Sequence, residues 1–149
     1  MNLRPNIDLF LNEKHIGIAH VSRNTKNFGG IVAKTLIDQG YHIYPVNSFA
    51  DEIAGMTCFK SIDVLPLGVK NLFILTNKRD TEAIVKDAIQ KGIKNIWIQN
   101  GCETPEAINT AKENNVNLVS GACILMYANP QGFHKFHQTI FRWTGKFHK

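Results

Sequence analysis

A polar stretch with two cations and two glycines, residues 22–30, follows the first predicted strand and leads into a predicted helix. Arg23 and Lys26 supply positive charge, and Gly29 with Gly30 lets the backbone come close to a ligand. The N-terminus of a helix adds unpaired N–H groups and the positive end of the helix dipole, which favour an anion. These features predict binding of a phosphate or pyrophosphate, with an ordinary solvated loop as the alternative.

Polar residues also follow the other predicted strands. Lys78 and Arg79 supply charge for a phosphate, or are simply solvated, and Gly101 permits a backbone turn close to a ligand. Cys102 has no histidine near it in the sequence to activate it, so we expect an unreactive loop cysteine.

The elements that must position these loops alternate along the chain. The run 71–75 is almost continuously apolar, which is typical of a strand buried on both faces. Strands that alternate with helices predict βαβ units, hence an α/β fold: a small doubly wound, Rossmann-like parallel sheet of about five strands with flanking helices and an extra C-terminal helix. Such sheets bind ligands at the carboxyl ends of their strands. The expected strands are 15–21, 41–46, 71–75, 95–98 and 117–119, and the expected helices are about 31–39, 81–91 and 105–114.

Helix-capping residues predict the ends of these helices. Asp80 is the expected N-cap of the second helix and Gly92 its stop, while Thr104 is the expected N-cap of the third, with Pro105 at its first position. Between strands two and three, residues 50–54 suggest a helical turn, and residues 56–59 suggest a short strand or an extended loop.

Known nucleotide and catalytic motifs are absent from the sequence. There is no G-x-G-x-x-G, no G-K-[ST], and no acidic residue at the end of strand two, which disfavours NAD binding in the standard mode. There is also no G-x-S-x-G and no H-E-x-x-H. His134 and His137 share a predicted helix face without further ligands nearby, so no metal site is expected.

Composition indicates one globular domain in a reducing compartment. The chain has 149 residues, 44% hydrophobic and 19% charged, and its three cysteines form no C-x-x-C. No apolar run approaches the ~18 residues that a membrane span needs. The net charge of +5 comes mostly from residues 114–149, which argues against a broad nucleic-acid surface. We expect a cytoplasmic protein with no nucleic-acid partner.

Four segments together resemble the small stand-alone CoA-binding proteins, relatives of the CoA-binding N-terminal domain of succinyl-CoA synthetase α subunits. The segments are 19–24 with Phe28-Gly29, 40–47 (G-Y-H-I-Y-P-V-N), 95–101 (N-I-W-I-Q-N-G) and 121–124 (G-A-C-I), and the similarity extends from about residue 13 to residue 127. The resemblance implies a Rossmann-like fold that binds coenzyme A or an acyl-CoA at the strand carboxyl ends. It supplies no established catalytic residue.

By matching position, the resemblance implies contacts along the whole ligand. Val21, Ser22 and Arg23 would face the CoA phosphates, Asn47 and Ser48 would lie near the nucleotide, and residues 76–78 would line the middle of the cleft. Gln99 and Gly101 would close it. The chain departs from the family at His20, where glycine is usual, at Ser48, where proline is usual, and in the loop 76–79, which often has proline. The implied ligand residues are His20, Val21, Ser22, Arg23, Lys26, Phe28, Gly29, Asn47, Ser48, Thr76, Asn77, Lys78, Gln99 and Gly101.

The C-terminal segment 129–149 is basic and aromatic, and is expected to form a helix beyond the CoA-binding domain of residues 1–128. Its aromatic stripe favours packing on its own domain or a homodimer over an anionic membrane surface. We interpret the chain as a non-catalytic or regulatory CoA-binding module. The alternatives are a nicotinamide-dependent or acyl-CoA-handling enzyme that uses Cys102, and a degenerate fold that acts through protein contacts.

Overall fold

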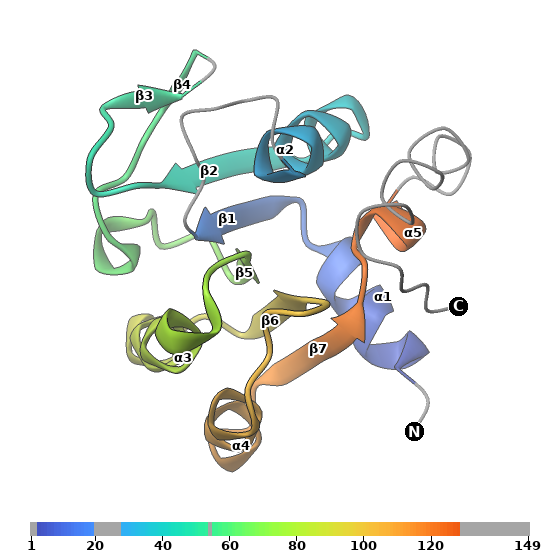
Figure 1. Cartoon of the computed structure of the whole chain (residues 1–149). Helices are drawn as coiled ribbons and strands as arrows, with labels where there is room; N and C mark the ends of the chain where they lie inside the picture. The colour runs from blue at the N-terminus through green and yellow to red at the C-terminus, as the bar shows by residue number, and fades with distance from the viewer. Residues whose placement is uncertain (1–2, 20–27, 54, 129–149) are drawn as a thin grey trace.

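Five parallel strands form the single large sheet of the computed structural model, which describes residues 3–19, 28–53 and 55–128. The strand order is β2-β1-β5-β6-β7, and it runs from top to bottom in Figure 1. The chain leaves β1 for β2 on one side and then returns to build β5, β6 and β7 on the other, so the order reverses between β1 and β5. The strands are β1 (His15–Ala19), β2 (His42–Val46), β5 (Asn71–Ile74), β6 (Asn95–Gln99) and β7 (Asn117–Ala122).

Helices cover both faces of this sheet, which confirms the predicted doubly wound α/β fold. One buried cluster lies under α1, α2 and α5, with Trp97 fully buried in it, and a second lies under α3 and α4. The helices are α1 (Arg4–Asn12), α2 (Phe28–Asp38), α3 (Lys78–Lys91), α4 (Pro105–Glu113) and α5 (Leu125–Ala128), with a 3-10 turn, η1 (Ile62–Val64). None of the helices within the described ranges is both long enough and apolar enough to cross a membrane.

The predicted helix ends are partly confirmed. Gly92 ends α3 with a φ of 94°, and the Thr104 hydroxyl accepts a hydrogen bond from the Ala107 N–H at 3.1 Å as the N-cap of α4. The prediction of Asp80 as an N-cap is wrong, because α3 begins three residues earlier, after Asn77. Asp80 instead lies in the first turn of α3, where its carboxylate interacts favourably with the positive end of the helix dipole.

Two local predictions differ from the structure, and one helix has no counterpart among the predicted elements. Gly29 and Gly30 lie within α2 and not in the loop before it, because packing of the buried Gly29 outweighs the low helix propensity of glycine. The expected helical turn at 50–54 is wrong, since β3 (Glu52–Ile53) pairs antiparallel with β4 (Met56–Thr57). Helix α1 is missing from the sequence predictions, although its buried residues Ile7 and Phe10 are three positions apart, as one face of a helix requires.

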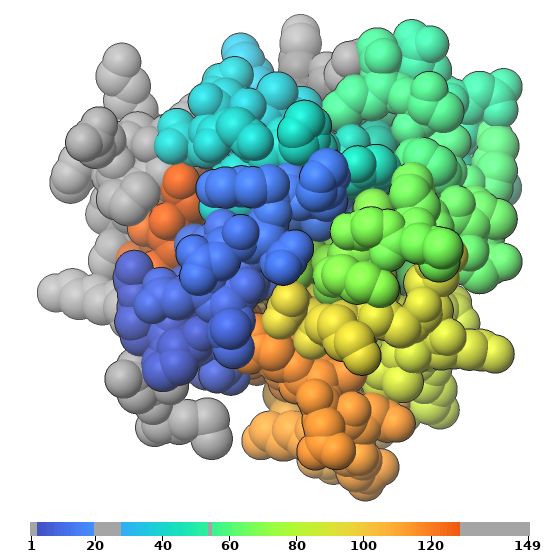
Figure 2. Space-filling view, turned by 180° about the vertical axis from the view of Figure 1, so that it is seen from behind, coloured from blue at the N-terminus to red at the C-terminus, as the bar shows by residue number. Residues whose placement is uncertain are grey.

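An asparagine ladder joins α1 to the amino edge of the sheet. Asn71, Asn95 and Asn117 open β5, β6 and β7 in register, and the Asn95 amide donates to Asn71 Oδ1 at 2.8 Å. Asn71 in turn donates to the carbonyl of Phe10, and Asn117 to a second α1 carbonyl. Phe10 completes the contact edge-on to Trp97, with 5.4 Å between ring centroids. Figure 2 shows the blue α1 segment beside the orange β7 and α4 segment.

Candidate functional site

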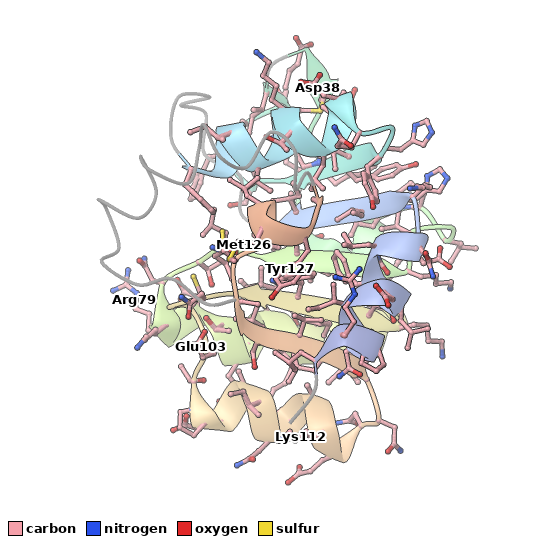
Figure 3. All side chains as sticks on the ribbon, turned by 90° about the vertical axis from the view of Figure 1, so that its right-hand side faces the viewer. Asp38, Arg79, Glu103, Lys112, Met126 and Tyr127 are labelled. Carbon is pink, nitrogen blue, oxygen red and sulfur yellow. The ribbon has the colours of Figure 1, made fainter. Side chains whose placement is uncertain are left out.

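The carboxyl edge of the sheet gathers the loops that the sequence singled out. Because the strands are parallel and in register, the residues after β2, β5, β6 and β7 meet at this edge. Figure 3 shows Arg79, from the start of α3, and Glu103, from the loop after β6, at the same edge. The reversal of strand order between β1 and β5 places the switch point at its middle.

Part of the expected site falls outside the described residues. His20, Val21, Ser22, Arg23 and Lys26 belong to this part, as does the C-terminal segment 129–149 with its expected helix. The other expected ligand residues are described: Phe28, Gly29, Asn47, Ser48, Thr76, Asn77, Lys78, Gln99 and Gly101.

Asn47 shapes the loop after β2. Its side-chain oxygen accepts hydrogen bonds from the N–H groups of Phe49 at 2.7 Å and Ala50 at 3.1 Å, which makes an Asx-type turn. The loop is further tied to the sheet, since the Asn47 N–H donates to the carbonyl of Phe59 at 2.9 Å. Ser48 and Phe49 are exposed on this turn, and Phe49 is 82% exposed.

Thr81 connects the loops after β5 and β6. It is fully buried, and its hydroxyl lies 2.8 Å from the carbonyl oxygen of Cys102 and 3.2 Å from that of Asn77. The hydroxyl of Thr76 lies 3.3 Å from it. This hydroxyl holds the first turn of α3 against the turn after β6, so the two loops form one unit. Sequence reasoning missed Thr81, because nothing in the pattern separates it from an ordinary first-turn threonine.

The first turns of α3 and α4 border a hollow of about 350 Å³. Lys78 and Arg79 bring two cations to it, and the N-cap Asn77 makes no side-chain hydrogen bond to the helix. Glu82 and Glu106 bring two carboxylates. The hollow is therefore of mixed charge, and the positive charge of Lys78 lies closest to the start of the helix.

Gln99 and Gly101 occupy different environments in the loop after β6. Gln99 is only 6% exposed, and its Oε1 accepts the N–H of Ile124 at 3.3 Å. Gly101 is exposed and has a φ of 96°, a region that favours glycine, and its N–H donates to the Glu103 carboxylate at 3.0 Å. Sequence reasoning did not assign Ile124 to the site, although the resemblance had already marked the segment 121–124.

Cys102 is buried against the α3 and α4 face of the sheet. Burial raises the pKa of its thiol, and a hydrogen bond with the Thr76 backbone opposes this rise in part. A raised pKa leaves the thiol protonated at neutral pH, and a protonated thiol is a weak nucleophile. The two histidines that lie in the described ranges, His15 and His42, stand at the opposite, amino edge of the sheet.

A doubly wound parallel sheet with polar loops at its switch point defines a Rossmann-like ligand-binding domain. Within that class, the chain belongs to the CoA binding domain family, whose sequence model matches residues 14–129. The chain is also similar to the uncharacterized protein YneT of Bacillus subtilis, 24% identical over 119 residues that cover 78% of this chain and 87% of that protein.

A larger relative is the α subunit of the ADP-forming acetate–CoA ligase II of Pyrococcus furiosus. It is 30% identical over 93 residues, which cover 62% of this chain and 20% of that protein. The chain therefore spans about a fifth of the length of this relative.

Solved structures share the fold. A conserved hypothetical protein from Pyrococcus furiosus has a TM-score of 0.71 at 29% identity, covering 76% of this chain and 97% of that one. A hypothetical protein from Pyrococcus horikoshii has a TM-score of 0.74 at 26% identity, covering 84% and 88%.

Proposed function

We propose that this protein binds coenzyme A or an acyl-CoA in the cleft at the carboxyl edge of the sheet, and that it acts by binding. Membership of the CoA binding domain family carries the proposal. The convergence of the loops after β2, β5, β6 and β7 at one edge supports the location, because ligands of open α/β sheets bind at the switch point.

The phosphates are assigned to the cationic side of the cleft. Arg23 and Lys26 from the sequence, together with Lys78 at the start of α3, supply the charge that phosphate groups require. The remaining expected contacts follow the order that the family resemblance implies, from Asn47 and Ser48 near the nucleotide to Gln99 and Gly101 at the far end.

A non-catalytic or regulatory role is favoured over acyl transfer by Cys102. The buried thiol with its raised pKa is poorly suited to nucleophilic attack at neutral pH.

The proposal also includes a cytoplasmic location and a homodimer, and light scattering coupled to gel filtration would test the dimer.

Calorimetric titration with CoA, acetyl-CoA, NAD and NADP tests the function. We expect saturable binding of the CoA forms, weakened by Arg23→Ala and by Lys78→Ala, and no binding of the nicotinamide nucleotides. Lys112→Ala, an exposed lysine near the C-terminal end of α4, is the matched control. A folded protein that binds neither CoA form contradicts the proposal.

A further inference from the structure

Gln99 is a buried amide whose oxygen, but not its NH2 group, has a hydrogen-bond partner among the described residues. Its Oε1 accepts the Ile124 N–H at 3.3 Å, and this bond fixes the orientation of the amide, because a flipped NH2 group would face another donor. Within residues 3–19, 28–53 and 55–128, no acceptor bonds to Nε2. With the residue only 6% exposed, an unpaired NH2 group at this depth is costly, so it points to an acceptor that a ligand supplies.

The surroundings of Gln99 indicate what kind of acceptor this is. Side chains alternate along a strand, so Gln99 shares the sheet face of Trp97, which is covered by α1, α2 and α5. Phe28, Leu75 and Cys123, which stand near the carboxyl edge, pack against the cluster on that face.

The cations that the structure describes at this edge belong to the other side of the sheet. Lys78 and Arg79 lie in the first turn of α3, which covers the opposite face. The proposed function assigns the phosphates of CoA to Arg23, Lys26 and Lys78, and Arg23 and Lys26 lie outside the described residues. A neutral amide donor among apolar side chains matches a neutral oxygen better than a charged one.

We propose that the Gln99 NH2 group donates a hydrogen bond to an amide carbonyl oxygen of the pantetheine arm of CoA. This inference rests on the proposed function and makes it specific. The uncharged arm lies along the face of α2 and α5, and Gln99 distinguishes CoA from nucleotides that lack the arm.

The test compares CoA with adenosine 3′,5′-bisphosphate, which lacks the pantetheine arm. Gln99→Met keeps the length of the side chain and removes its polar atoms. We expect the Kd for CoA to rise about tenfold, in the range of one lost hydrogen bond, while the Kd for the bisphosphate stays unchanged. Gln39→Met, at an exposed glutamine just after α2, is the matched control and changes neither value.

A second variant separates binding from folding. Gln99→Glu keeps an acceptor for the Ile124 N–H and, once ionised, has no donor. Its readout is the ratio of the two Kd values, in which a general charge effect on both ligands cancels. We expect the preference for CoA to fall in this variant too.

The outcomes separate the two proposals. A wild-type protein that binds neither ligand overturns the proposed function and, with it, the role of Gln99. Tight CoA binding with an unchanged ratio in the variants overturns the role of Gln99 alone. Equal affinities of the wild-type protein for CoA and the bisphosphate also overturn it, with no variant required.

Discussion

Asn71→Asp is the substitution for which the structure predicts the most distinctive behaviour. Asn71 is fully buried, donates to the Phe10 carbonyl and accepts from the Asn95 amide. An ionised carboxylate has the same shape but cannot donate, so it would place a negative charge against the Phe10 carbonyl oxygen. Protonation restores a donor.

The magnitude follows from the burial of the new carboxyl. Full burial raises a carboxyl pKa by about 3–5 units, and each unit corresponds to about 1.4 kcal/mol. At pH 7 the folded protein must take up a proton or bury the charge, which costs about 4 kcal/mol relative to an unfolded pKa near 3.9. A total stability of about 5–15 kcal/mol makes this loss severe.

The sign of the pH dependence is fixed by the raised pKa. Below the unfolded pKa the carboxyl is protonated in both states, so Asn71→Asp stays close to the wild type. The stability is lost as the pH rises toward the folded pKa.

Urea denaturation of the wild type and the variant between pH 4 and pH 8 measures this difference. Asn109→Asp, at an exposed position on α4, is the control and should differ from the wild type by no more than about 0.5 kcal/mol. A difference for Asn71→Asp that is the same at every pH would refute the reasoning, as would one no larger than the control.

Three further changes test the site and the core beneath it. Thr81→Val removes the hydroxyl that bonds to the Cys102 carbonyl. This change should lower the free energy of unfolding by about 1–3 kcal/mol and weaken CoA binding. An unchanged urea midpoint together with an unchanged affinity for CoA would contradict this prediction. Gly17→Ala places a Cβ 3.2 Å from side-chain carbons of Leu65 and Leu72, and this overpacking should lower the free energy of unfolding by about 1–3 kcal/mol, measured by thermal or urea unfolding. An unchanged free energy of unfolding would show that the two leucines move aside and would contradict this prediction. Because burial raises its pKa, the Cys102 thiol should react slowly with a thiol reagent at pH 7 and faster as the pH rises; labelling as rapid as in urea-unfolded protein would be inconsistent with this.

The five strands of the large sheet and two of the helix ends could be predicted from local sequence, because their causes are local. The buried run at 71–75 matches β5. Gly92, with its left-handed backbone, ends α3, and the pair Thr104–Pro105 begins α4, and both signals act through the local backbone. Asp80 misled the prediction, because an acidic residue suits either the N-cap or the first turn of a helix.

The sequence alone determined the class of fold and which loops would meet, since parallel strands in βαβ units bring their carboxyl ends to one edge. Tertiary structure decided the rest. Helix α1 is hydrogen-bonded to asparagines that are far from it in sequence, and Thr81 gains its role only when α3 packs beside the turn after β6. The hydrogen bond that orients the Gln99 amide likewise comes from Ile124, 25 residues away. Burial and hydrogen-bond partners are properties of the packed chain and not of its local sequence pattern.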